Sequence, residues 1–327
     1  MAAAVERSQR GVSRVLSKLD ISIDSGNYYE AHQMYRTLYF RYVGQNKFDE
    51  CLELLYNGSL KLLTKKQETS AADLGLLLID TLERRKNKDD VDLWIGQLTT
   101  IISRLSPNIV ERETLINRAI KWSADISGIP HGHPSMHKHI GEIFWNDGNI
   151  EQCRHHFLLS QDGNLCGRIL IKISLSKGFV KETDLFIVQA VLQQLCLKDS
   201  KTAEDTFVAY TKGHPEIKRT CFPYKQPLLN FIYFLFRSIE LNTFDIYLAL
   251  LELYKPSLKR DAAYEKYLMK ISCHYFGVTH PPENREGGIM GGMFGDLFSR
   301  LFQGFEDDDD EQQTMRCVNN THSAELD

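Results

Sequence analysis

The segment "HGHPSMHKH" holds the side chains of this chain that most resemble a metal site. Its histidines are His131, His133, His137 and His139. Imidazoles four positions apart on a helix share one face, as many zinc sites require. Pro134, however, suits the first turn of a helix and places His133 at or before the N-cap. Because no HExxH arrangement follows either, we expect a solvated turn and a helix start here, with a metal-dependent enzyme as the alternative.

No other segment carries a catalytic signature. The sequence has no GxGxxG, no Walker A loop and no GxSxG elbow, and "GGIMGG" lacks the Lys-Ser/Thr pair that a phosphate-binding loop needs. The seven cysteines are scattered without a CxxC pair, which disfavours both a disulfide framework and a zinc knuckle. We therefore expect a protein that is not an enzyme, binds no cofactor and keeps its thiols reduced.

Charge and hydropathy disfavour further classes of protein. Six acidic residues at 306–311 exceed the whole net charge of −4, so the rest of the chain is close to neutral. A nucleic-acid-binding protein would usually need a basic stripe. The opening "MAAAVERSQRG" has no apolar run, and the most apolar segment, residues 227–236, is half the length of a membrane span. These features predict a soluble, cytosolic protein.

One pattern returns along the chain: a glycine, any residue, an aromatic, two residues, a small residue, three residues and another aromatic. Gly26, Tyr28, Ala31 and Tyr35 fill it first. The other copies, complete or partial, are Phe48, Cys51 and Leu55; Gly148, Ile150, Cys153 and Phe157; Ala203 and Phe207; and Phe244, Tyr247 and Leu251. Small residues let two helices approach closely, and such hairpins must stack to bury their faces. The pattern predicts an all-α, right-handed α-solenoid of about fifteen helices in tetratricopeptide-like hairpins.

The same pass along the chain divides it into parts. Residues 1–278 are predicted to form a single α-solenoid, with a serine cap at Ser70 and a C-cap at Gly277 among its helix ends. The parts that follow are a linker at 279–288, an amphipathic helix at 289–305 and a disordered acidic tail at 306–327. The amphipathic helix either docks on the array or binds a partner.

The first copy of the pattern also carries polar side chains that its buried stripe does not need. They are Tyr29, His32, Arg36 and Arg41. Such residues are ordinary on the exposed face of a surface helix, so their presence alone does not separate a binding surface from a solvated one. This face is one candidate interaction surface, and the amphipathic helix at 289–305 is the other.

Several segments together resemble the Golgi-to-ER traffic protein four family, in the order in which the family has them. They are "GNYYEAHQMYRTLYFRYV" at Gly26, "SAADL" at Ser70, "RAIKWS" at Arg118, "FIVQAVLQQLCLK" at Phe186, "QPLLNFIYFL" at Gln226 and "YKPSLKRD" at Tyr254. The likeness covers most of the chain, including a glycine-rich last helix and an acidic tail closing on "ELD". It implies an all-α solenoid without a catalytic site, the cytosolic scaffold of tail-anchored-protein delivery to the ER.

The resemblance also implies two partner-binding regions. In the N-terminal half, Tyr29, His32, Arg36, Arg41, Asp73 and Asp80 would lie at or near the contact with the ATPase that carries tail-anchored proteins. In the C-terminal half, Tyr233, Phe234 and Tyr247 would bind the N-terminal segment of a ubiquitin-like protein, whose ubiquitin-like domain recruits the co-chaperone bearing the client. A BAG-family scaffold would join this complex, which would also handle mislocalised hydrophobic proteins.

The alternative is a different helical-repeat interaction module, either an RNA-binding protein or a subunit like those of the proteasome lid. The near-neutral charge of the chain disfavours the first. The extent of the family likeness disfavours the second. The targeting scaffold is the function that the sequence favours.

Overall fold

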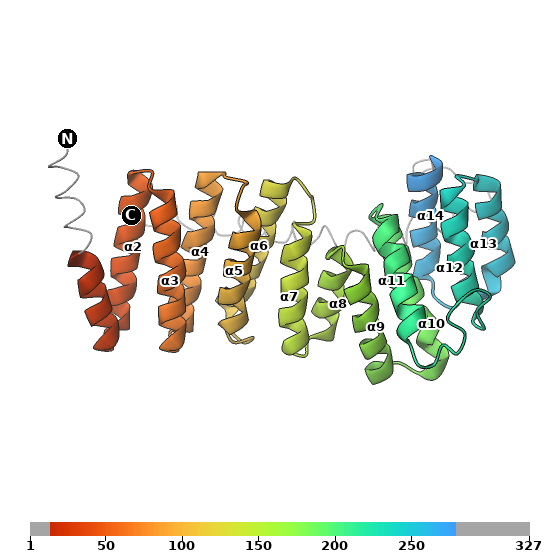
Figure 1. Ribbon diagram of the computed structural model, residues 1–327, viewed down its shortest axis with the longest axis horizontal. Helices are drawn as coiled ribbons and strands as arrows, with labels where there is room; N and C mark the ends of the chain where they lie inside the picture. The colour runs from red at the N-terminus through yellow and green to blue at the C-terminus, as the bar shows by residue number, and fades with distance from the viewer. Residues whose placement is uncertain (1–13, 279–327) are drawn as a thin grey trace, which may run out of the picture. The chain divides into compact units, whose positions relative to one another are not determined.

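The computed structural model describes residues 14–278, and every regular element in that range is helical (Figure 1). Residues 14–24 form the first helix. It is followed by α2 (Tyr28–Gly44), α3 (Phe48–Thr64), α4 (Glu68–Arg85), α5 (Val91–Arg104), α6 (Val110–Ser127), α7 (Pro134–Asn146), α8 (Ile150–Leu159), α9 (Gly163–Lys177), the 3₁₀ helix η1 (Val180–Glu182), α10 (Thr183–Cys196), α11 (Ser200–Gly213), α12 (Pro227–Glu240), α13 (Phe244–Leu258) and α14 (Ala263–Phe276). The predicted all-α class is confirmed. The predicted linker, amphipathic helix and acidic tail lie outside the described residues.

These helices group into two compact units, which divide within α9 between Ile169 and Leu170. In the first unit, α2, α4 and α6 form one layer and α3, α5 and α7 form the other (Figure 1). Short turns at 45–47 and 65–67 reverse the chain between consecutive helices. Each helix therefore packs against its neighbours in sequence and against the next helix of its own layer, as stacked hairpins do.

The recurring sequence pattern marks where helices begin and where they touch. The residue at the first aromatic position of the pattern is also the first residue of a helix in four copies. These residues are Tyr28 of α2, Phe48 of α3, Ile150 of α8 and Phe244 of α13. The small residues of the pattern, Ala31, Cys51, Cys153 and Ala203, are all 0% exposed. In the last copy, Tyr247 occupies the small place and is equally deep in the core, at 1% exposed. The small place of the pattern is a core position in every copy.

Of the two predicted helix ends, the C-cap at Gly277 is confirmed and the N-cap at Ser70 is wrong. Gly277 is the C-cap of α14, with a left-handed φ of +67°, as the sequence predicts. The predicted serine cap is wrong, because α4 begins at Glu68 and its N-cap is Gln67, which places Ser70 inside the first turn. The cause is the tight turn at Lys66, whose φ of +59° ends α3 and lets α4 start at once.

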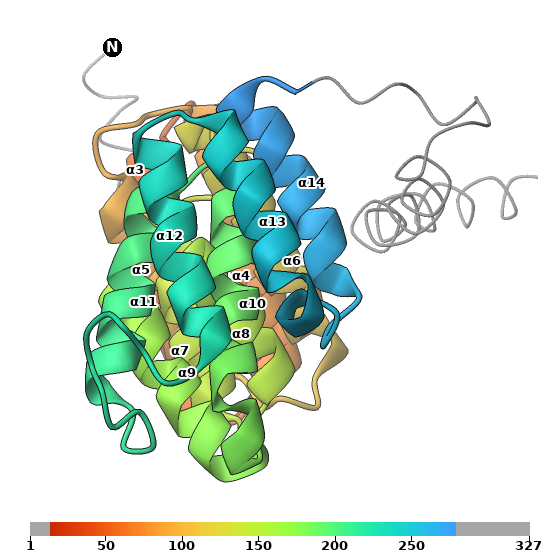
Figure 2. The same cartoon turned by 90° about the vertical axis from the view of Figure 1, so that its right-hand side faces the viewer.

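The second unit is built around α10. This helix is buried on nearly all sides and packs against α11, α12 and α14. Next to it, α12 and α13 lie side by side, with α14 beside α13 (Figure 2). In α13, however, only Tyr247 and Leu250 are buried, although the helix is mostly apolar. No helix in the described part of the chain is both long and apolar enough to cross a bilayer.

The histidine segment has the predicted turn and helix start, but the prediction that it is solvated is wrong for His137, which is 2% exposed. His133 is the N-cap of α7 and Pro134 is its first residue. The side chains of His137 and His156 are buried, with their Nδ1 atoms 2.8 Å apart. In the neutral pair, Nε2 of His137 donates to the carbonyl oxygen of His131 at 2.6 Å, so its Nδ1 accepts a hydrogen bond from Nδ1 of His156. Within the described residues, no group of three or more His, Cys, Asp or Glu side chains is placed to hold a metal ion.

Gly58 of α3 provides a direct test of close helix packing. A Cβ at this position would lie 2.5 Å from the ring of Tyr35, which is buried and cannot swing aside. We predict that Gly58→Ala lowers the free energy of unfolding by about 1–3 kcal/mol, because overpacking outweighs the better helix propensity of alanine. Gly96→Ala in α5, where an added Cβ meets nothing within 4 Å, should be neutral or stabilising. Equal urea midpoints for the two variants would contradict this packing.

The buried histidine pair predicts a pH dependence of stability. Burial lowers the pKa of both His137 and His156, so the folded protein keeps them neutral, whereas the unfolded chain protonates them near about pH 6.5. The contribution of the neutral pair to the free energy of unfolding is therefore fully present at pH values well above about 6.5. It falls as the pH decreases towards about 5.5, and the slope for each histidine approaches about 1.4 kcal/mol per pH unit as the unfolded chain becomes fully protonated.

Urea unfolding of the wild type and of His156→Leu between about pH 7 and 5.5 measures this dependence. We predict a shallower slope of unfolding free energy against pH for His156→Leu. Phe157→Leu alters the same buried region without removing a titratable group, and it should keep the wild-type slope. An unchanged slope in His156→Leu would show that the pair takes up a proton in the folded state.

Candidate functional site

One side of α2 presents large side chains to solvent. Tyr29, Arg36 and Phe40 are spaced seven and four residues apart and therefore share one face of the helix. Tyr29 is 79% exposed and Phe40 is 63% exposed. His32 lies four positions before Arg36 and is partly buried beside it. We call Tyr29, His32, Arg36 and Phe40 the α2 face.

Asp73 of α4 holds two side chains of the α2 face in position. Nε2 of His32 lies 2.7 Å from Oδ2 of Asp73, and Nη1 of Arg36 donates to both carboxylate oxygens at 3.0 Å. The hydrogen bond with His32 and the charge of Arg36 hold the pKa of Asp73 below its usual range. The carboxylate therefore stays ionised at neutral pH and orients the α2 face, with both of its oxygens engaged inside the chain.

The other two predicted contact residues of this half stand apart from the cluster. Asp80 lies two turns further along α4 and binds Arg118 of α6, with 2.6 Å between carboxylate and guanidinium. Glu83 binds the same guanidinium at 3.1 Å. Arg41 is in the last turn of α2, twelve positions after Tyr29 and so about a third of a turn away from the α2 face. The structure thus gathers four of the six predicted residues, and their contact with an ATPase stays a prediction.

Phe40 is the member of the α2 face that the sequence analysis misses. A signal for it is present, because Phe40 lies outside the buried stripe to which Tyr35 and Leu38 belong. It also follows Arg36 by four residues, which places it directly above that side chain on the helix. Exposed aromatic and arginine side chains in one line are typical of the centre of a protein–protein interface.

The second unit presents an aromatic cluster where the sequence predicts Tyr233 and Phe234 as contacts. Phe222, from the loop before α12, stacks on Tyr233 with ring centroids 4.5 Å apart and meets Phe234 edge-on at 5.2 Å. The guanidinium of Arg237 lies over the ring of Tyr233, 5.5 Å from its centroid. The structure therefore brings both predicted residues together, and Phe222 remains partly exposed on them.

An apolar stripe runs along the neighbouring helix α13. Ile246 and Leu253 are 42% and 72% exposed, and Ala249 between them is exposed as well. Their spacing of three and four residues places them on one face, which we call the α13 stripe. Tyr247, the third predicted contact, points into the core, and its hydroxyl donates to the carbonyl of Leu268 in α14 at 2.6 Å. In this structure Tyr247 joins α13 to α14, and its neighbours face solvent.

Known proteins are similar to this chain in sequence and in fold. The sequence profile of the Golgi to ER traffic protein 4 family matches residues 45–298. The Golgi to ER traffic protein 4 homolog of Xenopus tropicalis is 43% identical over 305 residues, which cover 93% of this chain and 92% of that protein. The homolog of Homo sapiens is 42% identical over 306 residues, covering 94% and 91%. The fold is similar to the crystal structure of C. therm. Get4, with a TM-score of 0.75 and 24% identity over 88% of this chain and 95% of that one. The chain therefore belongs to the Golgi to ER traffic protein 4 family.

Proposed function

We propose that this protein is a non-enzymatic adaptor of Golgi-to-ER traffic in the cytosol, which links the targeting ATPase of tail-anchored membrane proteins to a ubiquitin-like protein. The observation that carries the proposal is the pair of exposed surfaces, the α2 face in the first unit and the α13 stripe in the second. Both present large apolar side chains aligned on one exposed helix face, and such aligned apolar side chains suit contact with a partner protein. Two such surfaces suit a protein that brings partners together.

The α2 face is the proposed contact with the ATPase. Tyr29 and Phe40 would serve as aromatic anchors, with Arg36 between them as a charged contact. Asp73 would act indirectly, because it fixes the rotamers of His32 and Arg36 before the partner arrives. Such preorganisation reduces the conformational entropy lost on binding.

The α13 stripe is the proposed contact with the N-terminal segment of the ubiquitin-like protein. Apolar residues spaced three and four apart on an exposed helix suit a partner helix with an apolar face of its own. The aromatic cluster of Phe222, Tyr233 and Phe234 adds a rigid apolar surface in the same unit. A co-chaperone would join through the ubiquitin-like domain of that protein, and a BAG-family scaffold would join the same complex.

Proximity is the proposed mechanism. An adaptor that holds the ATPase and the client-bearing co-chaperone in one complex makes the transfer of the client intramolecular. The effective concentration of the acceptor then rises without any covalent step. The same assembly would retain mislocalised hydrophobic proteins.

Capture from cytosol tests both contacts at once. The immobilised chain should recover the targeting ATPase and the ubiquitin-like protein. We predict that Tyr29→Ala/Phe40→Ala reduces ATPase recovery by about tenfold or more, since aromatic anchors contribute about 2 kcal/mol each, and leaves the second partner bound. Ile246→Asp/Leu253→Asp should have the opposite selectivity. Both pairs of residues are exposed, so neither variant should unfold the protein.

Matched controls use exposed apolar residues elsewhere in each unit, Val110→Ala for the first and Val180→Asp for the second. Charge reversal of Asp73 or Asp80 is a poorer choice, because it also breaks the ion pairs to Arg36 or Arg118. Retention of both partners by both double variants would contradict the proposed surfaces. Failure of the wild type to capture either partner would contradict the proposed function.

A further inference from the structure

A turn in the second unit presents apolar side chains to solvent. It joins α9 to α10 through η1, and we call residues 175–181 the η1 turn. Leu175 is 54% exposed, Phe179 is 75% exposed and Val180 is 70% exposed. In the described part of the chain, Phe179 and Val180 are the one pair of consecutive residues that are both large, apolar and exposed. Contiguous apolar patches mark contact sites, whereas single exposed apolar residues are ordinary.

The backbone of the η1 turn is held in place by neighbouring elements. The amide of Gly178 donates to the carbonyl oxygen of Ser174 at 2.9 Å. Gly178 also lies so close to α10 that an added Cβ would be 2.5 Å from the ring of Phe186. Arg260, in the turn between α13 and α14, donates through Nη2 to the carbonyl oxygen of Lys181 at 2.9 Å. The exposed apolar side chains therefore project from a fixed turn, so little conformational entropy is lost when they are covered.

The exposed charge of the η1 turn is mainly positive. Lys177 and Lys181 are exposed, and neither has an ion pair within the described residues. The acids that follow them in the sequence are engaged elsewhere. Oε2 of Glu182 accepts from a backbone amide of the turn at 3.4 Å, and the buried Asp184 forms an ion pair of 2.6 Å with the same arginine that holds the turn. Two free ammonium groups thus flank the apolar side chains.

The η1 turn is convex. Its two consecutive apolar side chains are each more than two-thirds exposed, which leaves no walls of a groove around them. Peptides and helices bind proteins in grooves or along sheet edges, so this shape does not favour them. An apolar tip flanked by cations suits the surface of a bilayer, where apolar side chains enter the acyl boundary and cations attract anionic headgroups.

We propose that the η1 turn binds the surface of a membrane that contains anionic lipid. Phe179 and Val180 insert below the headgroups, and Lys177 and Lys181 keep their ammonium groups at the anionic headgroups while their aliphatic stems lie along the apolar boundary. Such a small apolar tip attaches weakly and reversibly. This inference does not rest on the proposed function, because neither the ATPase nor the ubiquitin-like protein enters it.

Co-sedimentation of the full-length chain with vesicles tests the contact. The vesicles are phosphatidylcholine with roughly 30% phosphatidylserine, and pure phosphatidylcholine is the neutral comparison. We expect binding to the anionic vesicles and binding about tenfold weaker or less to the neutral ones, because each lysine near an anionic surface strengthens binding by about fivefold. Equal binding to both compositions would overturn the proposal. So would the absence of binding to either, and the turn would then be a contact for a protein.

Two double variants separate the apolar from the electrostatic contribution. Phe179→Ser/Val180→Ser and Lys177→Gln/Lys181→Gln should each weaken binding to the anionic vesicles by about tenfold or more. Both alter exposed side chains, so both should keep the melting temperature of the wild type. Wild-type binding by either variant would overturn the proposal.

Matched controls lie elsewhere in the second unit. Leu197→Ser/Leu241→Ser removes two exposed apolar side chains. Lys198→Gln/Lys201→Gln removes two exposed cations beside the turn between α10 and α11, at the opposite end of α10. Both controls should bind the anionic vesicles like the wild type. A loss as large as that of the η1-turn variants would overturn the assignment to this turn.

A tryptophan at the tip distinguishes insertion from adsorption. In Phe179→Trp, lipids brominated on the acyl chains should quench the added indole, so the variant should lose a larger fraction of its fluorescence than the wild type. Equal fractional quenching of the two proteins would overturn the insertion of the η1 turn.

Discussion

Neighbouring helices in this chain approach closely because small side chains lie where the helices meet. Ala31, Cys51, Cys153 and Ala203 are completely buried, and the ring of Tyr35 packs directly on the bare backbone of Gly58. A single hairpin of two helices cannot bury its apolar stripe, so each pair depends on contact with the next one. The layers of the first unit, and every surface that they present, follow from this packing constraint.

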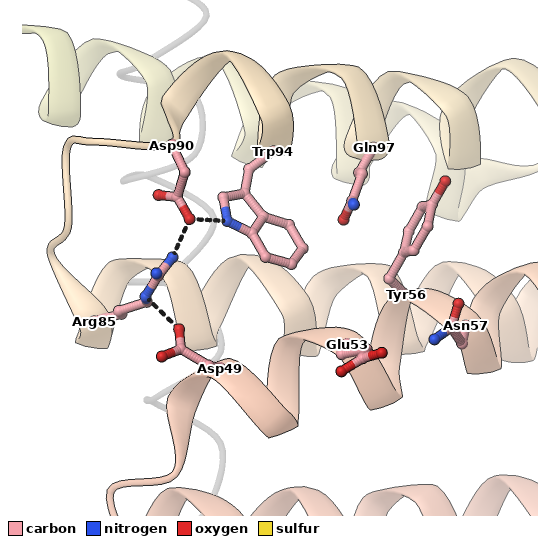
Figure 3. A pocket seen from close by; sticks show the side chains of 8 residues that line it. All are labelled: Asp49, Glu53, Tyr56, Asn57, Arg85, Asp90, Trp94 and Gln97. Atoms are coloured by element: carbon pink, nitrogen blue, oxygen red, sulfur yellow. Dashed lines mark hydrogen bonds and ion pairs between the residues drawn. The ribbon is translucent and has the colours of Figure 1, made fainter.

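Close packing brings side chains of different helices into contact and fixes their positions. Asp73 reaches His32 and Arg36 because α2 and α4 are neighbours in one layer, although the residues are 41 and 37 positions apart in the sequence. The same layering places α3 beside α5, so that Trp94 and Gln97 share a hollow with Glu53 (Figure 3). The first unit therefore has two differently built surfaces: the α2 face is aromatic and basic, and the hollow between α3 and α5 is mostly acidic. In the second unit, α13 provides a third surface, which is apolar.

Features that depend on local periodicity could be predicted from the sequence. The all-α class, the buried small residues and the N-cap at His133 follow from spacing and from proline chemistry, and the family follows from several ordered segments. Features that depend on which helices become neighbours could not be predicted. The engagement of Asp73 by His32 is one of them, and the ion pair between Asp80 and Arg118 is another. The burial of Tyr247 could be predicted from the sequence, because this residue occupies the small-residue position of the pattern and that position lies in the core in the other copies.

The central claim is that one chain binds two partners at once through separate surfaces. Sedimentation velocity of the purified chain mixed with the targeting ATPase and the ubiquitin-like protein tests this claim most directly. The account predicts one complex that contains all three proteins and sediments faster than either pair. Displacement of one partner by the other would show that the two surfaces are not independent and would contradict the adaptor mechanism.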